Sequence, residues 1–219
     1  MDSATQFIFQ ILILIFSVVV HEVSHGYAAL ALGDKTAQDA GRLTLNPLKH
    51  LDPFGSIILP SLSYMLGGFI FGWAKPVPYN PYNLKNRKWG PAIVALAGPF
   101  ANVSLAVVFG LIVRFMLLAG SRGPETALAG QFFFNFLTIA STIALLNLIL
   151  AFFNLVPIPP LDGSKLLFTI LPYQWRSIET FLEQYGFFIL LLFIFYFFRF
   201  LLPLVLFSFR LITGTLPIF

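Results

Sequence analysis

Five long apolar stretches dominate the sequence, and they constrain the fold more than any other feature. They cover residues 7–32, 54–73, 92–118, 132–153 and 187–207. A helix needs about 20 residues to cross the hydrocarbon core of a bilayer, so each stretch is long enough to span one. Of the 219 residues, 58% are hydrophobic and only 10% are charged, whereas soluble domains are about 25% charged. The sequence therefore predicts an all-α polytopic membrane protein and excludes an ordinary soluble domain.

The few charged residues narrow the class of protein further. The net charge of +4 comes from 13 Lys and Arg against 9 Asp and Glu. In so apolar a chain these basic residues are better interpreted as topology signals than as a nucleic-acid footprint, so no nucleic-acid partner is expected. The chain has no Cys, which excludes disulfides and thiolate metal sites. Asp2 precedes the first apolar stretch and no Lys or Arg does, so we expect an uncleaved first helix rather than a signal peptide.

The second apolar stretch, residues 54–73, is a poor straight helix because it contains Pro60 and the pair Gly67-Gly68. We expect a re-entrant or short β-like membrane segment there, with four to five transmembrane helices in all. If this segment returns to the side it entered from, nine basic residues gather on one face: Lys35, Arg42, Lys49, Lys75, Lys85, Arg87, Lys88, Lys165 and Arg176. The positive-inside rule then predicts a multi-pass protein of the cell membrane. Its N-terminus is extracytoplasmic and its loops 34–53, 74–91 and 154–186 are cytoplasmic.

The sequence His21-Glu22-Val23-Ser24-His25 lies inside the first apolar stretch. On a helix, residues i and i+4 share a face, so both imidazoles can bind one zinc ion. Glu22 is placed to take a proton from water rather than to bind the metal. Composition alone predicts about 10⁻³ such matches by chance, and ionisable residues at membrane depth are functional candidates. The alternative is a structural pairing of the three side chains within a helix bundle.

A catalytic zinc site needs a third protein ligand, and the candidates are His50 and the five Asp residues. Asp162 is the best of them, because it follows a helix that must break at Pro157, Pro159 and Pro160. Irregular backbone at membrane depth is tolerated where it is buried or lines a wet cavity. The alternative is a surface turn, since Pro-rich stretches that end in Asp-Gly commonly form one.

Taken together, these motifs resemble the site-2 protease family, the zinc metalloproteases that cut substrates within the membrane. The resemblance rests on His21-Glu22-x-x-His25, on Asn154-x-x-Pro157 with Leu161-Asp162-Gly163, and on Ala97-Gly98-Pro99-x-x-Asn102. The segment from Arg42 to Gly55 is similar to the compact bacterial subgroup without PDZ or CBS domains. The resemblance implies that His21, His25 and Asp162 bind one zinc ion and that Glu22 is the catalytic base. We expect a single protease domain over 1–219, with a catalytic core at about 7–171 and a C-terminal helix at about 187–207.

Three further polar residues have open roles. Asn154 is a candidate donor to the oxyanion or a helix-terminal cap. Asn102 fixes a loop or the substrate backbone, or makes an interhelical hydrogen bond. His50 is interpreted as a cytoplasmic-face residue or as one that supports the metal ligands, rather than as a ligand itself.

The expected substrate is a single-pass membrane protein or membrane peptide that binds in an extended form. Residues 41–45 and 54–73 are candidates for the strand edge that receives it, and residues 75–82 for an anchor at the lipid headgroups. A membrane transporter or channel, or an inactive scaffold with a buried metal site, is the alternative function. The sequence does not define the oligomeric state.

Overall fold

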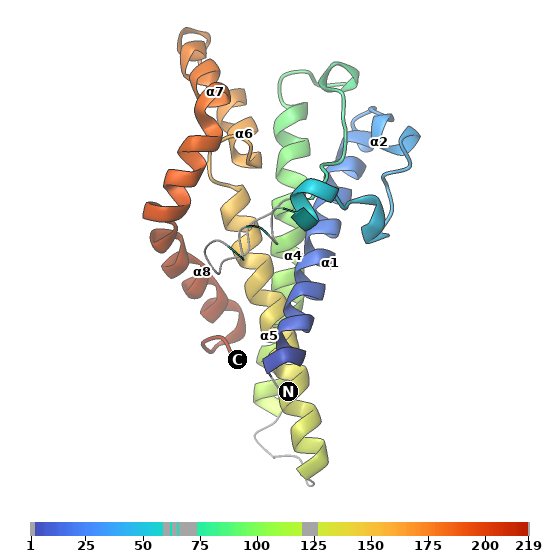
Figure 1. Cartoon of the computed structure of the whole chain (residues 1–219), viewed down its shortest axis with the longest axis vertical. Helices are drawn as coiled ribbons and strands as arrows, with labels where there is room; N and C mark the ends of the chain where they lie inside the picture. Colours follow the sequence, from blue (N-terminus) through green and yellow to red (C-terminus); the bar gives the residue numbers. More distant parts are fainter. Residues whose placement is uncertain (1–2, 59–61, 63–64, 66–73, 120–126, 219) are drawn as a thin grey trace.

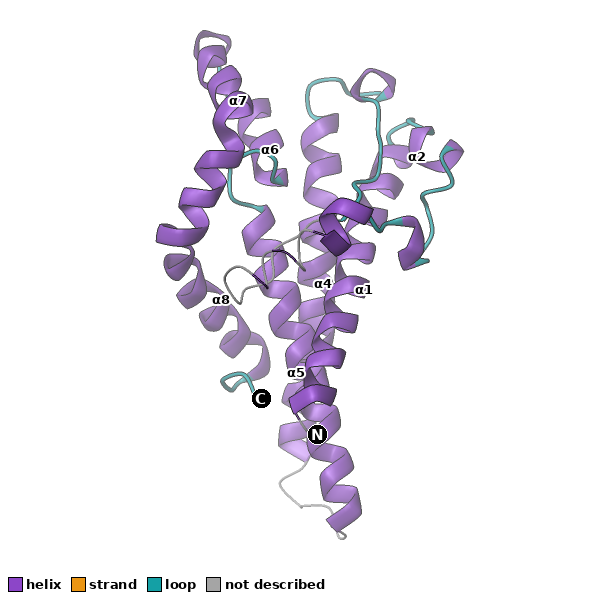
Figure 2. Ribbon diagram, in the orientation of Figure 1, coloured by secondary structure: helices purple, strands orange, loops and turns teal. Residues whose placement is uncertain are grey.

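The computed structural model describes residues 3–58, 62, 65, 74–119 and 127–218. All regular secondary structure in these residues is helical, as Figure 2 shows, so the all-α prediction is confirmed. The helices are α1 (Ser3–Ala31), α2 (Thr36–Asp39), α4 (Gly90–Ala119), α5 (Ala127–Asn154), α6 (Asp162–Ile170), α7 (Arg176–Leu192) and α8 (Phe198–Thr213). Shorter helical turns are η1 (Pro47–Lys49), η2 (Pro53–Ile58), η3 (Pro81–Asn83), η5 (Tyr173–Trp175) and η6 (Phe193–Phe197).

In the part of the chain that the structure describes, four helices are long and apolar enough to cross a membrane. They cover Thr5–Ala31, Gly90–Ala119, Ala129–Asn154 and Tyr173–Thr213. The multi-pass prediction is therefore confirmed, while the orientation of the termini stays a prediction. Most of residues 54–73 lie outside the described residues, so the re-entrant or β-like segment also stays a prediction.

The last spanning helix is longer than the apolar stretch that predicts it. The sequence placed it at about residues 187–207, whereas the helical run covers Tyr173–Thr213. Hydropathy marks only the part of a helix that can face lipid, and the polar residues before 187 do not interrupt its hydrogen bonds. The helix ends where Gly214 adopts a left-handed conformation with φ 78°, which is the usual end of a helix at glycine.

Helix α4 lies at the centre of the bundle and contacts α1, α5, α6 and α8. Figure 1 shows α1, α4 and α5 running side by side, with α7 and α8 along one flank. Small residues such as Ala106 and Ala144 are fully buried where α4, α5 and α8 meet around Phe209. In a membrane, helices associate through such close packing, because lipid tails are as apolar as the side chains.

The connection from α5 to α6 carries Asp162 into the bundle. Helix α5 ends at Asn154, and the Pro-containing turn leads to Asp162 as the first residue of α6. A Cβ atom at Gly163 would collide with the carbonyl oxygen of Leu155, so only glycine allows this tight return. The predicted break of the helix at the prolines is therefore confirmed, and α6 packs against α4.

Asp34 joins the end of α1 to the loop before α4. Its carboxylate accepts hydrogen bonds from the backbone N–H and hydroxyl of Thr36, from Asn80 N–H and from the Asn83 amide. Burial alone would raise the pKa of Asp34, but these hydrogen bonds outweigh burial and lower it below the ordinary value. Asp34 therefore stays ionised while fully buried, and it fixes the loop over the end of α1.

Candidate metal centre

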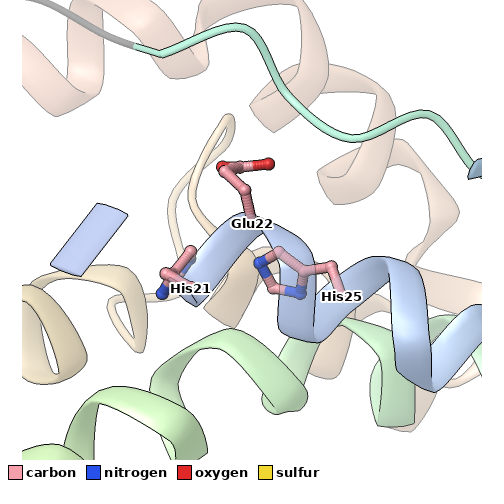
Figure 3. A group of neighbouring side chains, drawn as sticks. All are labelled: His21, Glu22 and His25. Carbon is pink, nitrogen blue, oxygen red and sulfur yellow. The ribbon is translucent and has the colours of Figure 1, made fainter. Parts of the chain in front are cut away.

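One turn of α1 presents two imidazoles and a carboxylate. The ring centroids of His21 and His25 lie 4.6 Å apart with their planes almost perpendicular. Potential ligand atoms of His21, Glu22 and His25 all lie within 4.8 Å of one another. Figure 3 shows that Glu22 leaves the helix in a different direction from the two imidazoles. This is the arrangement that the His-Glu-x-x-His spacing predicts on a helix.

The imidazole of His25 is oriented by the backbone of α4. Its Nδ1 atom lies 2.7 Å from the carbonyl oxygen of Val94. A carbonyl oxygen can only accept, so Nδ1 carries the proton and donates it. In the neutral imidazole, the lone pair is therefore on Nε2, the atom that lies 3.3 Å from Oδ2 of Asp162.

The imidazole of His21 is oriented by a side chain instead. Its Nδ1 atom lies 2.6 Å from Asn102 Oδ1 on α4, and Asn102 in turn donates to Asn147 on α5. Both asparagines are fully buried. Of the alternatives that the sequence left open for Asn102, the structure contains the interhelical hydrogen bond.

Asp162 completes the cluster from 137 or more residues away in the chain. Its Oδ2 atom lies 3.1 Å from Nε2 of His21 and 3.3 Å from Nε2 of His25. Oδ2 is buried and has no hydrogen-bond partner among the described residues. Three electron-pair atoms thus converge in a buried place, which is costly unless a proton or a metal cation lies between them. Two imidazole nitrogens and one carboxylate oxygen are also a donor set typical of catalytic zinc, so the residues present fit the metal.

Gly98 lets α4 approach this cluster. A Cβ atom at position 98 would lie 2.5 Å from Nε2 of His25 and 2.6 Å from Cε1 of His21. Both contacts are shorter than side-chain carbons tolerate, so only glycine fits beneath the two rings. The Gly98-Pro99 motif therefore has a packing reason that the sequence alone did not give.

The carboxylate of Glu22 faces a loop rather than a helix. Its Oε2 atom accepts a hydrogen bond of 2.8 Å from the backbone N–H of Val77. Pro76 and Pro78 have no N–H, so Val77 is the one donor in that run of three residues. The sequence assigned residues 75–82 to a headgroup anchor and missed this contact. The alternation of Pro with one donor residue is the signal that could have indicated it.

Arg42 and His50 hold this loop in place. Lys75 N–H donates to the carbonyl of His50, and Nη2 of Arg42 donates to the carbonyl of Lys75, each over 2.8 Å. His50 is only 1% exposed, and its Nε2–H donates to the carbonyl of Thr44. His50 is thus a buried residue that supports the loop facing Glu22. It is not part of the cluster of His21, His25 and Asp162.

Two other polar residues, Asn154 and Tyr79, have contacts that bear on the site. Asn154 is the last residue of α5, and its side-chain amide donates to the carbonyl of Leu150 over 2.9 Å. This contact is the helix-terminal alternative of the sequence analysis; its oxyanion role stays a prediction. Tyr79 packs against the apolar cluster of Ala29, Leu84 and Val94, and burial together with the negative charge of Asp162 raises its pKa. The sequence gave no sign that Tyr79 lies close to Asp162.

Comparison with known proteins defines the class. The profile of the family described as Peptidase family M50 matches residues 9–135 and 125–197. Because the match covers most of the chain, the chain belongs to this family of peptidases, the site-2 protease family that its motifs resemble.

Individual relatives support the same class. The chain is 40% identical over 188 residues to "Putative zinc metalloprotease YwhC" of Bacillus subtilis, a match that covers 83% of this chain and 77% of that protein. It is 33% identical over 178 residues to "Putative zinc metalloprotease Rip2" of Mycolicibacterium smegmatis, covering 80% of this chain and 62% of the relative. No solved structure matches the chain significantly. The names of these relatives contain zinc, the metal that the histidine spacing predicts.

Proposed function

We propose that this protein is an intramembrane zinc endopeptidase that hydrolyses a peptide bond in or near a transmembrane segment of a substrate. His21, His25 and Asp162 bind one zinc ion, and Glu22 is the general base. The observation that carries the proposal is that Nε2 of His21 and of His25, on a helix long and apolar enough to cross a membrane, both lie within 3.3 Å of Asp162 Oδ2 on α6. Membership of a peptidase family supports the same chemistry.

The ligand set is supported by what surrounds each ligand. Both imidazoles use Nδ1 to contact an oxygen atom, at 2.6 and 2.7 Å, which leaves Nε2 free for the metal. A histidine ligand that is held in this way keeps its tautomer and ring orientation. Zinc bound by these residues would polarise the scissile carbonyl and make water more acidic.

The reaction then requires one residue that carries a proton. Glu22 takes a proton from the attacking water as its oxygen bonds to the carbonyl carbon. The same carboxyl group gives the proton to the leaving nitrogen as the carbon–nitrogen bond breaks, so the proton balance closes without another group. The hydrogen bond from Val77 N–H holds the carboxylate of Glu22 in one orientation.

The substrate enters in an extended form, since a helix hides its amide groups. The expected substrate is a single-pass membrane protein or membrane peptide. Its candidate contacts are residues 41–45, which lie on the same side of the site as the loop that binds Glu22 through Val77. Asn154 is the candidate donor to the oxyanion. All parts of the site, from His21 to Asp162, belong to one helix bundle, which supports a single protease domain over 1–219.

The test is Glu22→Gln in full-length protein, reconstituted in lipid with a single-pass substrate. General base catalysis contributes roughly 10²- to 10⁴-fold, so we expect cleavage to fall by at least 100-fold while bound zinc stays at one per chain. Glu183→Gln, on the exposed surface of α7, is the matched control and should cleave normally. Retained cleavage in Glu22→Gln would reject the assigned base. A wild-type protein that binds zinc but cleaves no membrane substrate would favour the scaffold or transporter alternative.

A further inference from the structure

A chain of buried polar contacts runs from His21 through three helices. His21 Nδ1 lies 2.6 Å from Asn102 Oδ1, and Asn102 Nδ2 donates to Asn147 Oδ1 over 2.7 Å. The amide nitrogen of Asn147 donates to the carbonyl of Ile143 and to the hydroxyl of Ser17, each over 2.9 Å. Ser17, Asn102 and Asn147 are all at most 4% exposed. The contacts therefore form one relay from α5 to the cluster on α1.

The donor and acceptor of each hydrogen bond in this relay are determined at the end farthest from His21, where Asn147 contacts the carbonyl of Ile143. The carbonyl oxygen of Ile143 can only accept, so the Asn147 atom that contacts it must be the NH₂ group. The oxygen of Asn147 then faces Asn102, and it can only accept from the NH₂ group of Asn102. Asn102 is left with its oxygen toward His21, so His21 Nδ1 must carry the proton.

We propose that Asn147 is a positioning residue that sets the tautomer of His21 without touching the metal site. With the proton on Nδ1, the lone pair of His21 lies on Nε2, 3.1 Å from Asp162 Oδ2. Without Asn147 the amide of Asn102 is free to turn over and present its NH₂ group to Nδ1. That orientation stabilises the other tautomer, in which Nε2 carries a proton and cannot bind a metal.

His25 provides an internal contrast. Its Nδ1 donates to the carbonyl of Val94, which cannot turn over and needs no relay. Removal of Asn147 should therefore affect His21 alone. This inference rests on the proposed function, since it assumes that Nε2 of His21 binds zinc.

The first measurement is zinc affinity, by chelator competition on the full-length protein in detergent. Changes to residues that support a metal ligand cost about 10- to 100-fold in affinity. We expect Asn147→Leu to weaken zinc binding by about 10-fold, with Asn147→Ala as a second variant if the leucine is not accommodated. Thr142→Val removes another buried polar group of α5, one whose hydroxyl donates to the carbonyl of Thr138 in the same helix, and it should leave zinc affinity unchanged.

The second measurement separates tautomer control from helix packing. In an Asn102→Asp background, the residue facing His21 Nδ1 has only acceptor oxygens when ionised, so it needs no orientation by Asn147. Adding Asn147→Leu to this background should then cost less than 2-fold in zinc affinity. An equal loss in both backgrounds, or no loss in either, would overturn the proposal.

A spectroscopic readout tests the same point in metal-free protein. The ¹⁵N shifts of the imidazole, assigned with His21→Gln, distinguish a proton on Nδ1 from one on Nε2. We expect a proton on Nδ1 of His21 in the wild type, where it faces Asn102 Oδ1. In Asn147→Leu the Nδ1 signal of His21 should shift toward that of an unprotonated nitrogen, with the Nδ1 signal of His25 unchanged. An unchanged His21 signal would overturn the proposal. A wild-type protein that binds no zinc would instead overturn the proposed function itself.

Discussion

Two sides of the same site are built by different means. On the helical side, which is α4 and α5, oxygen atoms of Val94 and Asn102 orient the imidazoles of His25 and His21. On the loop side, which is residues 42–50 and 74–79, one backbone N–H binds Glu22. The loop that leads to Val77 is held at Lys75, whose carbonyl accepts a hydrogen bond from Arg42 and whose N–H donates to the carbonyl of His50.

This difference separates metal binding from proton transfer. The helical side depends on close packing, where an added methyl group has no room, and its failure should release zinc. The loop side depends on the position of a single N–H, and its failure should leave zinc bound while Glu22 loses its orientation. Variants on either side should therefore lower turnover, but only variants on the helical side should lower the zinc content.

The largest effect is expected for Gly98→Ala on the helical side. The new Cβ atom would lie 2.5 Å from Nε2 of His25, and the hydrogen bond of His25 to Val94 prevents the ring from moving aside. We expect zinc affinity to fall by roughly 100-fold, the upper end of the range for residues that support a ligand. Zinc content after dialysis against a chelator measures this loss.

Gly110→Ala is the matched control in the same helix. Its Cβ atom would lie 2.7 Å from Cγ2 of Ile212 on α8, three turns away from the cluster. It should lower the thermal stability but leave zinc bound. Full zinc content in Gly98→Ala, or equal loss in both variants, would contradict the packing argument.

Arg42→Ala on the loop side should lower turnover without releasing zinc. Arg42 is 7% exposed and donates to the carbonyl of Lys75, and a hydrogen bond from a charged group contributes about 1.5–3 kcal/mol. We expect kcat to fall roughly 10- to 100-fold because Val77 N–H no longer holds Glu22 in position. Zinc stoichiometry should remain at one per chain.

Arg87→Ala, an exposed basic residue of the same loop region, is the control and should have normal kcat. Arg42→Lys keeps one charged donor and should recover part of the rate. If Arg42→Ala lost its zinc together with its activity, the two sides of the site would not be separable.

The helical side was accessible to prediction because a helix has a fixed period. The spacing of His21 and His25 determines that they share a face, and the prolines after Asn154 determine that Asp162 lies on a new element. The sequence thus predicted the three residues that the structure brings within 3.3 Å. Asn147 was missed, although an amide in the middle of an apolar helix is costly in a membrane and is itself a signal.

The loop side could not be predicted from the sequence, because no local period relates Val77 to Glu22, 55 positions earlier. The path of a loop depends on contacts such as Arg42 with Lys75, which form only when the helices are already packed. His50 illustrates the limit. Its neighbours Lys49 and Asp52 suggested a face exposed to solvent, whereas the side chain is 1% exposed.

The smallest effect on the site is expected for Asp34→Asn, which alters the attachment of the loop side to α1. Asp34 accepts four hydrogen bonds, from Thr36, Asn80 and Asn83. Its loss of charge should destabilise the protein by roughly 1.5–3 kcal/mol at neutral pH. Zinc content and kcat should change less than 2-fold, since Arg42 and His50 still hold Lys75 and Pro76.

The pH dependence of stability shows whether the charge of the Asp34 carboxylate causes the stability difference between wild type and Asp34→Asn. The pKa of Asp34 is lowered from 3.8 in the folded protein, so its contribution is complete above 3.8 and is lost as the pH falls through the lower folded value. The difference in Tm between wild type and Asp34→Asn should therefore be constant near neutral pH and shrink below about pH 3.8. Asp39→Asn, exposed on α2, should match the wild type at every pH. A difference that did not depend on pH would assign the effect to packing, and a loss of zinc in Asp34→Asn would show that the loop side also supports the metal.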